Sequence, residues 1–182
     1  MKTKLKVIAL LVLVATSLTY AEESKGVYFG LGMHQSKMSG DGDKEAYKKN
    51  TWKALIGMRL NSNWSMEGQY ANFAADTVVY TDKTTTREGL LSGKSFGVAG
   101  LYHFNPQGSY SPFVKLGWHR HSFKLSAPAT VGTYDGSGNH EFYGVGLDGK
   151  INETIKYRVE LERMNIGGVD MDNIGASLLF GF

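Results

Sequence analysis

The sequence predicts an all-β protein, an eight-stranded antiparallel up-and-down transmembrane β-barrel. First, bulky apolar residues alternate with small or polar residues in eight separate segments, as in strands with two unlike faces. Second, these segments are about 9–11 residues long and are joined by alternating long and short connections, as in membrane barrels with turns at one end and loops at the other. Third, the last segment, residues 173–182, is apolar enough to aggregate in water unless it is buried or faces lipid.

A cleavable leader is predicted before the first strand. Lysines precede the apolar run 7–15, and Thr19-Tyr20-Ala21 places small residues at the two positions that a cleavage site requires. The run is too short for a membrane-spanning helix, which needs about 20 residues. Residues 1–21 are therefore expected to be a signal peptide that is removed, and residues 22–182 to form a single barrel domain.

The net charge of the chain gives no support for nucleic-acid binding. Three of the 20 basic residues lie in the leader, so the remaining basic residues balance the 17 acidic residues. The basic isoelectric point is then no sign of nucleic-acid binding. The chain has no cysteine, which excludes disulfides and thiol chemistry.

The first four strands are expected at residues 26–34, 51–60, 64–73 and 95–104, each with one apolar face. The turn Asn61-Ser-Asn63 joins the second to the third. The apolar faces consist of Val27, Phe29, Leu31 and Met33; Trp52, Ala54, Ile56, Met58 and Leu60; Trp64, Met66 and Tyr70; and Phe96, Val98, Tyr102 and Phe104.

The last four strands are expected at residues 112–124, 141–149, 155–164 and 173–182. Short turns at 105–108 and 150–154 precede the first and third of these. Their apolar faces consist of Val114, Leu116 and Trp118; Tyr143, Val145 and Leu147; Ile155, Tyr157, Val159 and Leu161; and Ile174, Leu178, Phe180 and Phe182. The long polar connections, centred on residues 36–50, 75–94 and 125–139, are expected to be solvated loops.

The opposite faces carry glycines and charges, so the barrel is predicted to be apolar outside and polar inside. A lipocalin-type soluble barrel has the reverse polarity. Because an eight-stranded barrel is just wide enough to be filled by its own side chains, and buried charges must be paired, the interior is expected to be a structural plug. A gated, very narrow pore is the alternative. The residues of this predicted interior charge network are Lys53, Arg59, Glu67, Lys115, Asp148, Arg158, Glu160 and Glu162.

With eight strands, long loops and the closing Phe180-Gly-Phe182, the chain resembles the OmpA/OmpX-like family of small outer-membrane β-barrels over residues 26–182. Residues 56–61, 67–70 and 96–104 are similar to segments of that family. The resemblance implies a monomer in the cell outer membrane of a Gram-negative bacterium, in contact with outer-membrane lipids and lipopolysaccharide. It also implies that Phe180 and Phe182 signal to the barrel-assembly machinery, and that the protein has a role in envelope structure and surface interaction, with extracellular ligands bound through its loops. The peptidoglycan-binding domain of larger members is not expected, because the sequence ends at the barrel.

One segment, His119-Arg-His-Ser122, has residues suited to catalysis. One class of outer-membrane deacylase uses a histidine and a serine two positions apart on a strand, but His121 and Ser122 are adjacent and face opposite sides. His119 and His121 share a face and could bind a metal, but no third ligand is evident. No catalytic residue, cofactor or metal site is therefore expected. A narrow channel and a lipid A-modifying enzyme are kept as alternative functions.

Two arginines are expected on the outer wall. By parity Arg120 and Arg163 point outward, each eight residues above the start of its strand, which places them at the outer interface of the membrane. Cations there could bind lipopolysaccharide phosphates.

Overall fold

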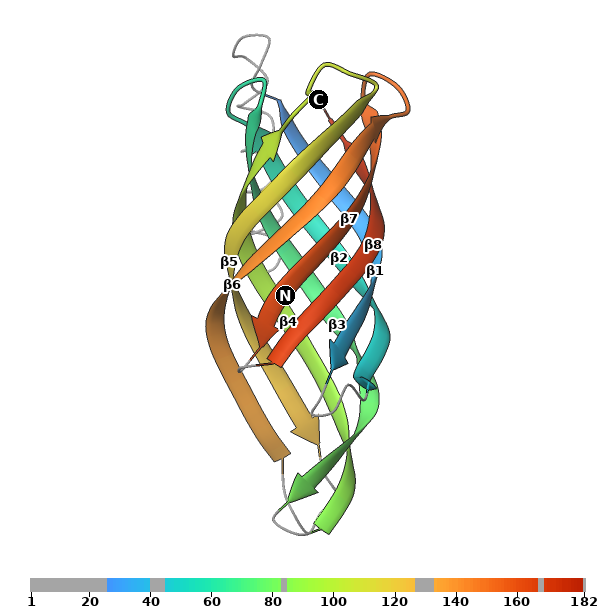
Figure 1. Cartoon of the computed structure of the whole chain (residues 1–182), viewed down its shortest axis with the longest axis vertical. Coiled ribbons are helices and arrows are strands. Elements are labelled where there is room, and N and C mark those ends of the chain that lie inside the picture. Colours follow the sequence, from blue (N-terminus) through green and yellow to red (C-terminus); the bar gives the residue numbers. More distant parts are fainter. Residues whose placement is uncertain (1–25, 40–44, 83–84, 127–132, 167–168, 182) are drawn as a thin grey trace, which may run out of the picture.

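The computed structural model describes residues 26–39, 45–82, 85–126, 133–166 and 169–181, which form one closed antiparallel barrel (Figure 1). Each strand pairs with the next, and β8 pairs with β1. This confirms the predicted fold class. The strands are β1 (Val27–Ser39), β2 (Glu45–Arg59), β3 (Trp64–Asp82), β4 (Thr85–His103), β5 (Tyr110–Ser126), β6 (Thr133–Lys150), β7 (Ile155–Ile166) and β8 (Val169–Phe180).

Two predictions lie outside the described residues: the leader with its cleavage site, and the terminal Phe182. Among the described residues, no helix is long and apolar enough to span a membrane.

The strand register gives the tilt of the barrel. Following paired residues once around the wall from Val27 on β1 returns to β1 at Lys37, a shear of ten residues. Shear and strand tilt are linked, so each strand is displaced along the barrel axis by a little over one residue relative to its predecessor. The path runs through Met58, Met66, Gly100, Leu116, Tyr143, Arg163 and Asp172.

The two ends of the barrel differ. At one end, the turn end, β2, β4 and β6 are joined to the next strand by short turns. In two of them an asparagine organises the turn: Asn61 Oδ1 accepts hydrogen bonds from the N–H groups of Asn63 and Trp64, both at 2.9 Å. Asn152 Oδ1 accepts from Thr154 and Ile155 at 2.9 and 2.8 Å. These are Asx turns, as the predicted turn positions require.

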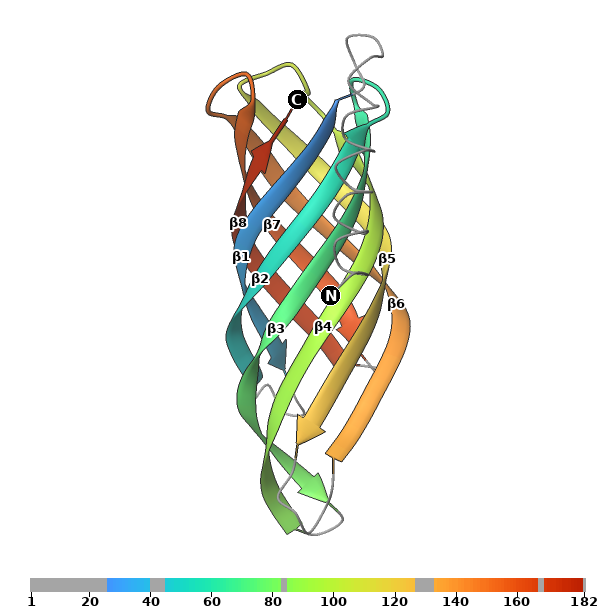
Figure 2. The same ribbon diagram turned by 180° about the vertical axis from the view of Figure 1, so that it is seen from behind.

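At the other end, the hairpin end, the strands are longer than predicted. Most of the residues in the segments 36–50, 75–94 and 125–139 continue the strands, so the prediction of loops there is wrong over most of their length. The β3–β4 hairpin reaches Asp82 and Thr85 and extends furthest from the barrel (Figure 2). Beyond the membrane a β-ribbon needs cross-strand hydrogen bonds and residues such as threonine, valine and tyrosine, but no alternation of polarity.

The outer wall carries an apolar belt between two rings of aromatic residues. Leu31 is 57% exposed, Leu116 60% and Ile174 58%, although all three are strongly apolar. The turn-end girdle contains Trp64, Tyr102, Phe104, Tyr157 and Phe180, and the hairpin-end girdle contains Trp52, Tyr70, Phe96, Trp118 and Tyr143. Two girdles flanking an apolar band are the pattern of barrels that span an outer membrane.

Candidate functional site

The centre of the barrel is crossed by buried ion pairs. Arg158 on β7 is fully buried and donates two hydrogen bonds to Asp148, at 2.7 and 3.0 Å, and one to Glu67 at 2.6 Å. Its guanidinium carbon lies 4.5 Å from the ring centre of Phe113, a cation–π distance. Tyr28 donates its hydroxyl proton to Glu67 at 2.7 Å. Arg158 thus ties β3, β6 and β7 together.

Two lysines extend this network across the lumen. Lys115 Nζ lies 2.7 Å from Glu160, 3.0 Å from Glu162 and 3.3 Å from Glu67. Lys53 pairs with Glu160 and, at 3.1 Å, with Glu162. Seven of the eight predicted interior residues are therefore buried in one connected set of contacts.

Arg59 is the one predicted interior charge that does not join the network. It lies at the end of β2, is half-buried, and donates a hydrogen bond to the carbonyl of Ser62 in the adjoining turn at 3.2 Å. Its parity is that of the inner face, but the strand ends there and the side chain reaches the turn instead of the centre.

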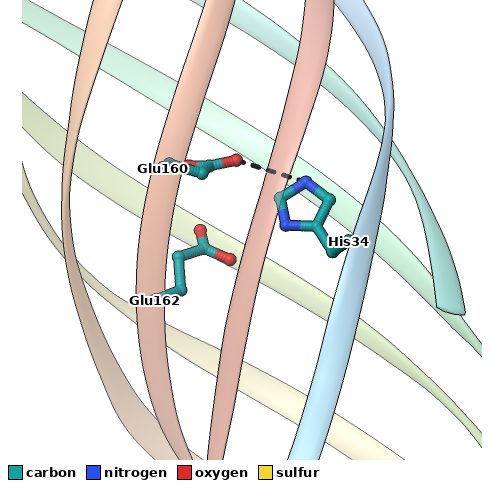
Figure 3. Close-up of side chains that lie close together, drawn as sticks. All are labelled: His34, Glu160 and Glu162. Carbon is teal, nitrogen blue, oxygen red and sulfur yellow. Dashed lines mark ion pairs between the residues drawn. The ribbon is translucent and has the colours of Figure 1, made fainter. Parts of the chain in front are cut away.

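His34, Glu160 and Glu162 form a compact trio inside the network (Figure 3). One ligand atom from each lies within 4.8 Å of the others, a spacing that a metal ion could use. However, the ammonium groups of Lys53 and Lys115 already contact both carboxylates. Because these ammonium groups compensate the negative charge, the trio is better explained as part of a structural cross-link than as a metal centre.

Apolar side chains form a second layer on the hairpin side of the charges. Phe73 and Phe123 stack at 5.3 Å between ring centres, and Met164, Ile166 and Met171 are buried with them. This layer was not predicted. The signal was present, because Phe73 and Phe123 share the inward parity of the charged residues. Two layers of side chains consequently cross the lumen.

A glycine on the inner face makes room for one large aromatic ring. A Cβ atom added at Gly117 would come within 2.7 Å of the ring of Phe142, which is fully buried. The mixture of glycines and bulky residues is thus what lets a narrow barrel fill its own interior.

Both outward arginines point where parity placed them, but their surroundings differ. Arg163 is exposed and donates to both carboxylate oxygens of Asp172, at 2.5 and 2.7 Å. These hydrogen bonds lower the pKa of Asp172, and they leave Arg163 with its charge compensated.

Arg120, in contrast, is exposed beside Lys94, and within the described ranges no ion pair is recorded for either of them. With Ser122 they line a cavity of about 250 Å³ that also touches Tyr70 and Phe96 of the hairpin-end girdle.

The histidine segment is divided between the two faces as expected, since His121 is buried and Ser122 is exposed. The structure also places beside these histidines a residue that the sequence analysis did not connect with them. His140 on β6 pairs in register with His119, and its ring stacks on that of His121. No local pattern indicates this, because β5 and β6 are joined by a long connection.

Comparison with known proteins places the chain among membrane barrels. Residues 7–182 match the family described as the outer membrane protein beta-barrel domain. The chain belongs to this family. No curated protein sequence matches the chain.

Three solved outer-membrane barrels are similar to this chain. Each is compared over 88% of this chain. The attachment invasion locus protein Ail of Yersinia pestis, solved with the heparin analogue sucrose octasulfate, matches with a TM-score of 0.63 and 17% identity over 100% of its chain. The surface protein NspA of Neisseria matches with a TM-score of 0.69 and 13% identity over 100% of its chain. OprG of Pseudomonas aeruginosa matches with a TM-score of 0.65 and 12% identity over 97% of its chain. At these identities the similarity shows the fold.

Family membership gives the barrel its orientation. Outer-membrane barrels have short turns in the periplasm and longer extracellular segments, so the turn end of this barrel faces the periplasm and the hairpin end faces outward. The hairpin-end girdle then lies in the outer leaflet. Register places Lys94 and Arg120 just beyond that girdle, two residues from Phe96 and Trp118 respectively.

Proposed function

We propose that this barrel is a sealed anchor of the bacterial envelope that binds outer-leaflet lipopolysaccharide and presents its hairpins at the cell surface. The observation that carries the proposal is the doubly blocked lumen. The ion pairs of Lys115 and Arg158 fill its middle, and the stacked Phe73 and Phe123 lie on the outer side. A lumen filled in this way favours a structural role over a narrow channel.

Current through planar bilayers tests whether the lumen is sealed. The purified protein is expected to give no current steps above a protein-free membrane. Glu160→Gln, which removes one charge and keeps the side-chain shape, is expected to give none either, because the apolar layer remains. Regular current steps from the unmodified barrel, or a rise in current with Glu160→Gln, would favour the channel alternative.

The lipid part of the proposal rests on Lys94, Arg120 and Ser122, which we name the phosphate patch. Two cations and a hydroxyl group offer charge-assisted hydrogen bonds to phosphate oxygens. The adjoining Tyr70 and Phe96 provide an apolar wall for acyl chains. Arg163 is a weaker candidate than parity alone suggested, because Asp172 already occupies its guanidinium.

Lipopolysaccharide that remains bound during purification in mild detergent measures the contribution of this patch. Lys94→Ala combined with Arg120→Ala is expected to reduce bound lipopolysaccharide roughly five- to thirtyfold, as for the loss of two partly screened contacts of about 0.5–1 kcal/mol each. Arg163→Ala is the matched control, since it removes an outward cation that is already paired. Retention at the unmodified level in the double variant would contradict the lipid proposal.

The hairpins are the proposed surface for extracellular ligands, since β3 and β4 continue well past the girdle. A lipid A-modifying enzyme has less support. His121 and Ser122 lie on opposite sides of the wall, so they cannot act together on one bond.

A further inference from the structure

Three of the five histidines of this chain meet on the inner face of β5 and β6, beyond the hairpin-end girdle. His119 faces His140 across the two strands, and His121 lies two residues further out. The ring centres of His119 and His121 are 5.4 Å apart, and those of His121 and His140 are 5.3 Å apart.

This spacing is the one that a shared metal ion requires. Two imidazoles bound to one tetrahedral Zn²⁺ through bonds of about 2.0–2.1 Å have their ring centres about 5 Å apart. In these two pairs the ring centres already have about that separation, so His121 and its two neighbours need to turn about their side-chain torsions to share one ion. Since they project from two hydrogen-bonded strands, the backbone already holds them at that separation.

The protonation of His119 suits metal binding. Its Nε2 lies 3.2 Å from the backbone carbonyl of Asn165, and because a carbonyl can only accept, Nε2 carries the proton. Nδ1 therefore carries no proton and accepts a hydrogen bond from the Ser95 hydroxyl at 3.0 Å. Metal-binding histidines commonly donate their second N–H to a backbone carbonyl in this way.

A buried, unpartnered nitrogen of His121 is an independent observation that points to a ligand. His121 is only 5% exposed, and its Nδ1 is buried without a hydrogen-bond partner among the described residues.

The site borders open space on its β6 side. Gly138 is the register partner of His121, and Gly136 follows on the same inner face. A Cβ atom at Gly136 would meet nothing within 4 Å, and His140 is only half-buried. On β5 the ring of Phe123 lies 5.7 Å from that of His121, so the approach to the rings that these two glycines leave uncovered runs along β6.

We propose that His119, His121 and His140 bind one transition-metal ion of the Zn²⁺ class inside the hairpin half of the barrel. Imidazole ligands suit Zn²⁺, Cu²⁺ and Ni²⁺, whereas Ca²⁺ and Mg²⁺ prefer oxygen ligands. The inference is independent of the proposed anchoring function.

Zn²⁺ titration by calorimetry tests the site, using the full-length barrel in detergent without a polyhistidine tag. One equivalent is expected to bind, and His121→Ala and His140→Ala are each expected to weaken binding at least tenfold. His103→Gln is the matched control. His103 is also buried and inward, but it hydrogen-bonds to Ser65 and Ser111 near the turn end. An unmodified barrel that binds no Zn²⁺, or a His103→Gln variant that loses as much affinity as His121→Ala, would overturn the proposal.

Cu²⁺ provides a second readout that does not depend on folding of a variant. Electron paramagnetic resonance of the unmodified barrel with one equivalent of Cu²⁺ is expected to show coupling to three imidazole nitrogens. Coupling to fewer than two would show that the ion is not held by this cluster, and would equally overturn the proposal.

Discussion

Arg158→Met is expected to lower the free energy of unfolding by about 3–5 kcal/mol, as when one partner is removed from a buried ion pair. Methionine fills much of the same volume, so loss of packing contributes little. The cost arises because Asp148 loses its bidentate cation and Glu67 is left with Lys115 alone, and both carboxylates are almost fully buried. The cation–π contact with Phe113 is lost as well.

Urea unfolding in phospholipid vesicles, followed by tryptophan fluorescence, measures this change. Arg163→Met is the matched control, because Arg163 makes a similar two-bond contact with Asp172 on the exposed outer wall. Exposed ion pairs contribute about 0–1 kcal/mol, so the control should stay close to the unmodified protein. Equal losses in the two variants would contradict the assignment of a buried central network.

The sequence was sufficient for the fold and for most of the interior charges because the strand period is local. Alternation along each segment identifies which residues share a face, and closing eight such strands sends one face inward. Lys53, Lys115 and Glu160 could therefore be placed inside without knowing which partner each would contact. The same parity placed Arg120 and Arg163 outside.

Features that depend on register could not be predicted. The pairing of Arg163 with Asp172 and of His119 with His140 follows from how neighbouring strands are offset, and long connections leave that offset free. Arg59 shows the complementary error, since its parity is correct but it lies at the turn end of β2, away from the central charges. The strand extensions escaped prediction because a solvated ribbon has no alternating polarity.

The polarity of the wall is the central claim, and it is tested most directly by one substitution made at two depths on the same face of β1. Leu31 lies in the middle of the apolar belt, and Gln35 lies four residues further out, at the level of the hairpin-end girdle. In a bilayer, arginine costs about 2–4 kcal/mol at the midplane of the lipid-facing wall and about 0–1 kcal/mol near the interface.

Leu31→Arg is therefore expected to lower the free energy of unfolding in vesicles by about 2–4 kcal/mol, and Gln35→Arg by at most about 1 kcal/mol. If this wall faced water, replacing an exposed leucine with arginine would leave stability unchanged or increase it. Equal stabilities for Leu31→Arg and the unmodified protein, together with a folded monomer in buffer free of detergent and lipid, would contradict the account.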